Sequence, residues 1–270
     1  MGRNENLYIN ELINYYLNIG VDTLFLYEDN IEENERFINV ITPNDSIVIE
    51  YTKNYSIINQ GQSFTHCYSK HKDEYDFLIM IDMDEYLIIN NNTLKGYLSD
   101  KVFDKCHFIK INWRDANDND LLYYENKSLF ERFKGPFFRS NYIKTILKGG
   151  INHLKYWIHS PRFSPEKNIS CDNNGKVVND INNTNAFFQY IRPHNSDKAY
   201  FWHFSFKSTE EYIKKVKRGY RNWPHLDPVS YIKMYFKFNK LTIEKVEMFE
   251  KAFNLTLNNY RIKLKKKSEK

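Results

Sequence analysis

The chain has 270 residues and a mass of 32.7 kDa, a length that suits one large α/β domain. Aromatic residues make up 17% of it, which excludes an intrinsically disordered chain. The net charge is +5, and residues 263–270 carry much of the excess. Such a short basic tail is typical of a solvated end, and no basic stripe with interleaved aromatics predicts a nucleic-acid partner. No apolar run approaches the ~20 residues of a membrane span and no signal peptide is visible, so we expect a cytoplasmic protein.

The three cysteines, Cys67, Cys106 and Cys171, are far apart and form no C-x-x-C motif. Their odd number and wide spacing argue against a disulfide framework and against a zinc site. We therefore expect reduced, mostly buried thiols.

The first half of the chain predicts helices that alternate with strands. Residues 8–19 place apolar side chains at helical spacing, and Gly20 follows where a C-terminal cap belongs. The next expected elements are a strand at 21–27, a strand at 47–49, a helix at 63–72, a very apolar strand at 77–81 and a strand at 108–113. This alternation predicts a mostly parallel sheet that helices cover on both faces.

The second half is less regular. Residues 114–199 are rich in Asn, Gly and Pro, and we expect an irregular, partly antiparallel region that frames a site. Ser208 and Glu211 form a capping box that predicts the start of a helix, and a last helix is expected over 242–253. No linker or internal repeat is apparent. The expected organisation is one domain, residues 1–262, followed by the basic tail.

The most informative chemical feature is the strand at 77–81, which leads directly into Asp82, Asp84 and Glu85. Residues two apart on an extended segment point the same way, so Asp82 and Asp84 would face the crevice where α/β folds bind ligands. Two neighbouring carboxylates repel each other unless a cation joins them, and oxygen ligands favour a hard ion such as Mn²⁺ or Mg²⁺ that also binds phosphates. The alternative is that both residues merely cap a turn.

A second cluster lies at Trp202–Ser208, where His203 stands between aromatic residues. Lys207 follows at the entrance of the predicted helix, whose N-terminus favours anions. A metal ligand beside a phosphate-binding lysine would complete a pyrophosphate site. The alternative for His203 is a packed core histidine.

These motifs belong to a longer series that spans nearly the whole chain. The matching segments are Arg3-Asn4-Glu5, Glu11, residues 19–22, 26–30, 62–67 and 77–87, Trp113, residues 131–133, Lys144, residues 159–161, Asp172 with Gly175, and residues 203–219. In this order they resemble GT-A glycosyltransferases of the branch grouped as family 92 and its family 2-like relatives. The shared patterns include D-x-D-E-(F/Y) and H-x-x-x-K-S-x-E-E-(F/Y). Trp202 and Phe204 depart from the family, which has Asn and Tyr there.

The resemblance implies a GT-A, Rossmann-like fold and a hexosyltransferase that uses Mn²⁺ or Mg²⁺. The donor would be a nucleotide sugar, with a UDP-sugar as the expected one, and the acceptor a hydroxyl of a glycan, protein or lipid. It implies that Asp84 binds the metal directly, that Asp82 contacts the ribose or the metal through water, and that His203 is the third protein ligand. Lys207 would neutralise the diphosphate.

The remaining roles concern the nucleoside and the catalytic base. By resemblance, Glu28, Asp29 and Asn30 would face the nucleoside, with Arg3 and Glu5 nearby. An inverting enzyme also needs a carboxylate that deprotonates the acceptor. The candidates for this base are Asp115, after the strand at 108–113, and Asp118 behind it; each could instead be an ordinary loop residue.

In the family, a strand directly precedes the Arg3-Asn4-Glu5 segment, at a place that here falls ahead of Met1. Without it, the strand at 21–27 would have an open edge and nucleotide binding would be weak, unless homo-oligomerisation or a rearranged segment covers the edge. Two alternatives therefore stay open. One is a non-catalytic, degenerate GT-A binding module. The other is a metal-dependent hydrolase of nucleotide sugars or phosphate esters, which needs no acceptor.

Overall fold

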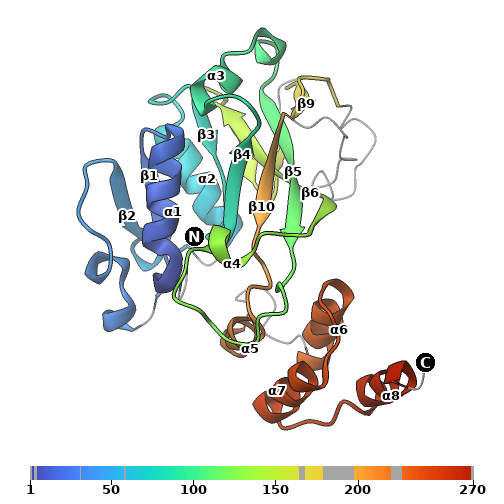
Figure 1. The fold of residues 1–270 in the computed structure, drawn as a ribbon. Helices are drawn as coiled ribbons and strands as arrows, with labels where there is room; N and C mark the ends of the chain where they lie inside the picture. Colours follow the sequence, from blue (N-terminus) through green and yellow to red (C-terminus); the bar gives the residue numbers. More distant parts are fainter. Residues whose placement is uncertain are drawn as a thin grey trace. The chain divides into compact units, whose positions relative to one another are not determined.

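The computed structural model describes residues 2, 5–30, 32–57, 59–163, 168–178, 198–219 and 227–268. These residues form a mixed α/β fold (Figure 1). The sequence predicted one domain, and the contacts within the chain divide it into two compact units. The first unit contains residues 1–114 and 139–203, and the second contains 115–138 and 204–270.

The first unit holds the sheets and three of the described α-helices. Its helices are α1 (Asn6–Ile19), α2 (Gln60–His71) and α3 (Leu94–Leu98). Its strands are β1 (Leu24–Glu28), β2 (Ile47–Tyr51), β3 (Phe77–Ile79), β4 (Glu85–Ile89), most of β5 (Phe108–Ala116) and of β6 (Phe137–Lys148), β7 (Lys155–Tyr156), β8 (Pro161–Phe163), β9 (Ser170–Asp172) and β10 (Ala199–His203).

The main sheet has the order β3-β6-β5-β10-β4, and β9 pairs with β5. The β3–β6 and β4–β10 pairs are antiparallel, whereas β5–β9 and the separate β1–β2 pair are parallel. The expected α/β class is therefore confirmed, but the finer expectation of a mostly parallel sheet is not: the sheet is mixed. The strand expected at 77–81 ends at Ile79, and β4 begins only after a turn.

Helix α1 forms where the apolar periodicity predicts it, and Gly20 ends it in the left-handed conformation at φ 101°. Its buried face includes Tyr16, whose hydroxyl donates to Glu85 O (2.9 Å) and accepts from Leu87 N (3.1 Å). Tyr15 Oη also donates to Leu87 O (2.7 Å). These bonds fasten α1 to β4, so the helix fixes the strand that follows the acidic turn.

An edge of β1 faces an edge of β3 across a cavity of about 680 Å³. Residues 22–27 line one side and residues 76–81 the other, together with apolar side chains such as Phe64. Within the described part of the chain, β1 pairs with β2 and, on Glu28, with Gly2, which donates to Tyr27 O and accepts from Asp29 N (both 2.9 Å). The open edge expected for this strand is thus present along most of β1.

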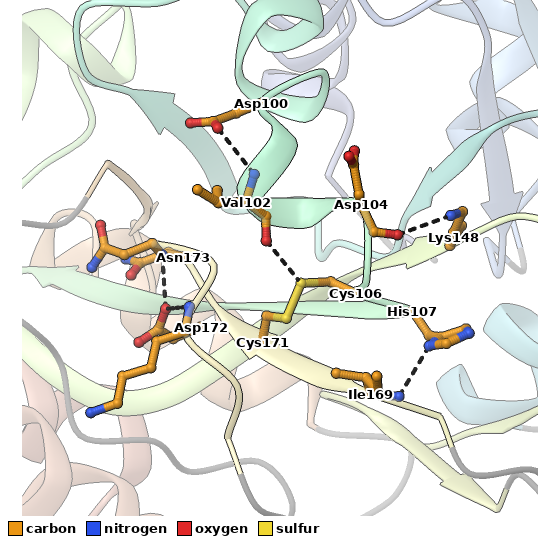
Figure 2. The surroundings of a disulfide bond; sticks show 12 residues. Asp100, Val102, Asp104, Cys106, His107, Lys148, Ile169, Cys171, Asp172 and Asn173 are labelled. Carbon is orange, nitrogen blue, oxygen red and sulfur yellow. Dashed lines mark hydrogen bonds between the residues drawn. A yellow bond between two sulfur atoms is a disulfide. The ribbon is translucent and has the colours of Figure 1, made fainter.

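Cys106 and Cys171 form a disulfide, with Cα atoms 5.8 Å apart (Figure 2). The expectation of reduced thiols is wrong for these two residues. They are 65 positions apart in sequence, and the parallel pairing of β9 with β5 brings them together. Cys67 is a buried free thiol, as expected.

The second unit is built mainly of helices. They are α4 (Leu129–Arg132), α5 (Thr209–Arg218), α6 (Pro228–Phe238), α7 (Ile243–Phe253) and α8 (Asn258–Ser268). The capping box of Ser208 and Glu211 starts α5 as predicted, and α7 matches the helix expected at 242–253. Helix α8 covers part of the expected basic tail. Across the described residues of both units, none of the helices has the length and apolar character needed to cross a membrane.

A candidate carboxylate and histidine site

The acidic motif lies in the tight turn between β3 and β4. Glu85 N donates to Asp82 O (3.3 Å), and Asp82 N donates to the Glu85 carboxylate (3.1 Å). The β3–β6 pairing brings this turn beside β6, which carries Lys144. The sequence located the carboxylates correctly at the end of an apolar strand, but it gave no information on the strand that lies next to them.

Lys144 joins the carboxylates of this turn. Its side chain is fully buried, as is that of Glu85. Lys144 Nζ donates to Asp82 Oδ2 (3.0 Å) and to Ile158 O (2.9 Å), and lies 3.6 Å from Glu85 Oε1. Sequence reasoning did not assign a site role to Lys144, although the resemblance includes a lysine there. The sequence could not predict the ion pairs of Lys144 with Asp82 and Glu85, because they depend on the antiparallel pairing of β6 with β3.

The charges in this cluster are set by burial and by each other. Burial disfavours the charged forms, yet the Lys144 ammonium outweighs that effect and lowers the pKa of Asp82. For Lys144, burial is likewise outweighed by Asp82 and Glu85, so its pKa is raised. Burial raises the pKa of Glu85 well above its usual range. Asp82 is therefore a carboxylate paired with an ammonium at neutral pH.

Asp84 faces His203 across two paired strands. The antiparallel register of β4 with β10 places His203 opposite Glu85, the residue next to Asp84. His203 Nε2 lies 3.8 Å from Asp84 Oδ1, and both side chains are largely buried. The structure therefore brings together two residues that the sequence separates by more than a hundred positions.

This pair fits one divalent cation. Metal–oxygen and metal–nitrogen bonds of ~2.0–2.2 Å can span a ligand separation of up to ~4 Å, which includes the observed 3.8 Å. Both oxygens of Asp82 are engaged, one by Lys144 and the other by Gln60 Nε2. The described residues contain no group of three or more His, Cys, Asp or Glu side chains arranged to hold a metal. Asp84 and His203 would thus hold an ion whose other ligands are water or phosphate.

An aromatic cluster encloses His203. The centroid of the Trp113 ring lies 4.1 Å from that of the His203 ring. The Trp113 ring also stacks on Tyr142 at 5.4 Å and packs edge-to-face with His159 at 5.0 Å (distances between ring centroids). Burial and the nearby Lys144 charge lower the pKa of His159 to about 3. His159 is therefore neutral, and its Nδ1 donates to Ile143 O (3.0 Å). With the Trp113 ring against it, the His203 side chain is only 12% exposed.

The residues expected near the nucleoside are largely committed to internal contacts. Glu28 is fully buried and accepts from Arg36 Nε (2.6 Å), Asn30 Nδ2 (3.1 Å) and the Phe37 amide. Glu28 and Asn30 therefore organise the loop after β1.

The other residues expected near the nucleoside are Asp29, Glu5 and Arg3. Asp29 accepts from Thr52 Oγ1 (3.2 Å). Glu5 lies at the N-terminal end of α1, without a capping side-chain bond. Arg3 falls outside the described residues.

Three further candidates, Lys207, Asp115 and Asp118, belong to the second unit. Lys207 is buried directly before α5, and Asp115 is half-buried near the end of β5. Asp118 is 1% exposed, lies 2.6 Å from Lys245 Nζ and accepts from Tyr235 Oη. These contacts favour a structural role for Asp118 over that of a catalytic base.

No protein-family model and no curated protein sequence matches this chain. The functional assignment therefore depends on the site geometry and on the order of the motifs.

Proposed function

We propose that this protein is a metal-dependent glycosyltransferase with a GT-A-like fold, which moves a hexose from a UDP-sugar to an acceptor hydroxyl. The observation that carries the proposal is the approach of His203 Nε2 to within 3.8 Å of Asp84 Oδ1. The order of the other motifs along the chain supports it. A site with two protein ligands suits an ion that also binds the diphosphate of the donor.

In this proposal each residue has a defined task. Asp84 and His203 would hold Mn²⁺ or Mg²⁺, which would offset charge on the leaving diphosphate. Lys144 keeps Asp82 ionised and oriented, so that Asp82 can accept a hydrogen bond from a metal-bound water or a ribose hydroxyl. The ring of Trp113 limits the access of water to His203. In an inverting reaction, Asp115 would take the proton from the acceptor.

The test is a calorimetric titration with UDP, with and without Mn²⁺. The parent protein should bind UDP more tightly when Mn²⁺ is present, and Asp84→Asn should lose this difference. Asp22→Asn, which changes a carboxylate with a 70% exposed side chain, is the matched control and should behave like the parent. Equal UDP affinity with and without Mn²⁺ in the parent would contradict the metal-dependent site.

A second candidate is a binding module without transferase activity. It is favoured by the internal contacts of Glu28, which leave its carboxylate little capacity for a nucleoside. Turnover over a panel of nucleotide sugars separates the possibilities. A transferase releases UDP faster when an acceptor is added, a hydrolase releases UDP and free sugar without one, and a binding module releases neither.

A further inference from the structure

The Cys106–Cys171 disulfide fastens a short hairpin to the main sheet (Figure 2). The hairpin starts with β9 and returns through an antiparallel bridge between Cys171 and Val177. Strand β9 pairs with only three residues of β5, residues 108–110. Pairing over three residues attaches β9 only weakly to β5, because strands this short have little stability of their own. The amides of His107 and Phe108 also donate to Ile169 O (2.9 and 3.2 Å), and the disulfide adds a covalent bond to these contacts.

The tip of this hairpin holds the start of β10. Asn173 is fully buried, and its side-chain amide donates to Ala199 O (2.7 Å). Asn174 Oδ1 accepts from Lys198 N (3.2 Å). Tyr97 Oη, from α3, donates to Asn173 O (2.9 Å) and fixes the tip from its other side. The hairpin thus supplies hydrogen bonds to the first backbone groups of β10.

Strand β10 connects this anchored end to the candidate site. It runs from Ala199 to His203, and His203 faces Asp84. Its pairing with β4 extends over all five residues and fixes its register. On its other side β10 is hydrogen-bonded to β5 in the main sheet, and the hairpin adds a further attachment at the end that lies away from the site. Loosening this attachment would release the backbone groups of Lys198 and Ala199, at the start of β10, from their hydrogen bonds to the hairpin.

We propose that the disulfide is a redox-sensitive clamp on β10. With the bond formed, the hairpin is held against β5 and the start of β10 is ordered; with the bond reduced, both are released. Forming the bond removes two protons and two electrons from the thiols of Cys106 and Cys171. A disulfide oxidant, such as oxidised glutathione, accepts them and becomes two thiols; a dithiol reverses the reaction. Such bonds persist in oxidising compartments, in contrast to the cytoplasmic location expected from the sequence.

The first test counts thiols and follows backbone exchange in the full chain. After incubation with oxidised glutathione, alkylation in denaturant followed by mass measurement should show one free thiol, and after dithiothreitol three. On reduction, hydrogen exchange at residues 171–178 and 198–199 should accelerate at least tenfold, whereas the amides of α1 should be unchanged. Three free thiols under oxidising conditions, or equal exchange in both states, would overturn the clamp.

Two variants separate the clamp from general effects of the reductant. The double variant C106A/C171A should show the fast exchange of the reduced protein and no response to dithiothreitol. Its melting temperature should fall by about 10 °C, since the bond closes a long loop. C67A, which removes the free thiol, should keep the full response. If C106A/C171A shows the slow hydrogen exchange of the oxidised parent, the clamp is refuted.

The link to regulation rests on the proposed function, and the measurements keep the two apart. Titration of UDP with Mn²⁺ should show at least threefold weaker binding after reduction. If UDP does not bind in either state while exchange still responds to reduction, the proposed function fails and the clamp stands. If UDP binds with Mn²⁺ equally in both states, the clamp does not regulate the site.

Discussion

His203 Nε2 and Asp84 Oδ1 lie 3.8 Å apart because the β4–β10 register places His203 opposite the residue that follows Asp84. Neither residue alone indicates a site: one is an acidic residue in a turn and the other a histidine among aromatic rings. Together they bring a carboxylate from the turn before β4 and an imidazole from the end of β10 to one place, which is the pair that we propose as metal ligands.

The first prediction concerns this pair. Changing His203 to Gln should weaken the Mn²⁺-dependent part of UDP binding at least tenfold, because the imidazole is one of two proposed protein ligands. The melting temperature should change little. His153→Gln, at an exposed position in the same unit, serves as the control. Calorimetry with and without Mn²⁺ measures the effect, and an unchanged metal dependence in H203Q would exclude His203 as a ligand.

Lys144 should be essential for stability. Lys144→Met leaves the fully buried Glu85 and the partly exposed Asp82 without their cation, so we expect the free energy of unfolding to fall by about 3 kcal/mol. Urea denaturation followed by circular dichroism measures this loss. Adding Asp82→Asn to K144M removes one unpaired carboxylate and should restore part of it. A double variant no more stable than K144M would show that the Asp82–Lys144 pair is not the cause.

The stability should depend on pH through His159. Its folded pKa of about 3 lies below the unfolded value of about 6.5. The unfolded chain therefore binds the proton more readily between these values. The contribution of His159 to the free energy of unfolding is fully present above pH ~6.5. It declines as the pH falls below that value, by up to about 1.4 kcal/mol per pH unit.

His159→Asn keeps a donor for Ile143 O and removes the titrating ring, so its unfolding free energy should vary less between pH 7 and pH 4.5. Urea titrations at several pH values measure this. H153N is the control, since His153 is exposed. Parallel curves for H159N and the parent would show that another group causes the acid sensitivity.

Substitutions should distinguish the roles of the two candidate bases, Asp115 and Asp118. Asp118→Asn breaks the buried pair with Lys245 and should lower the stability of the second unit by about 3 kcal/mol. Asp115→Asn should lower acceptor-dependent UDP release at least a hundredfold and cost less stability than D118N. Thermal unfolding and a UDP-release assay provide the two measurements. A fully stable but inactive D118N would reverse the assignment.

The cavity between β1 and β3 should accept a strand. An extension of about five apolar residues, joined ahead of Gly2, would continue the parallel pairing that Gly2 makes at Glu28. It would pair with the open edges and fill the cavity, so both the melting temperature and the affinity for UDP should rise. A Gly/Ser extension of equal length is the control. If both extensions act alike, the cavity does not accommodate a strand.

Local sequence patterns predicted the local elements well. The apolar periodicity located α1 and the glycine at its end, and the capping box located the start of α5. The carboxylates were correctly placed after β3, but the extended segment expected for Asp82 and Asp84 is a turn between β3 and β4. Features that depend on tertiary pairing were missed. The Lys144 ion pairs require β6 to lie antiparallel to β3, and the disulfide requires β9 to pair with β5. Neither partner strand is specified by residues near those positions.

Burial of the third cysteine has a consequence for disulfide shuffling. Three cysteines allow three different pairings, and exchange between them proceeds through a thiolate. Cys67 lies against Tyr27 and Ile57, and burial raises the pKa of its thiol to about 12. At pH 7 only about one Cys67 thiol in 10⁵ is ionised. The folded protein is therefore protected against scrambling, and mispaired forms should arise only while the chain is unfolded.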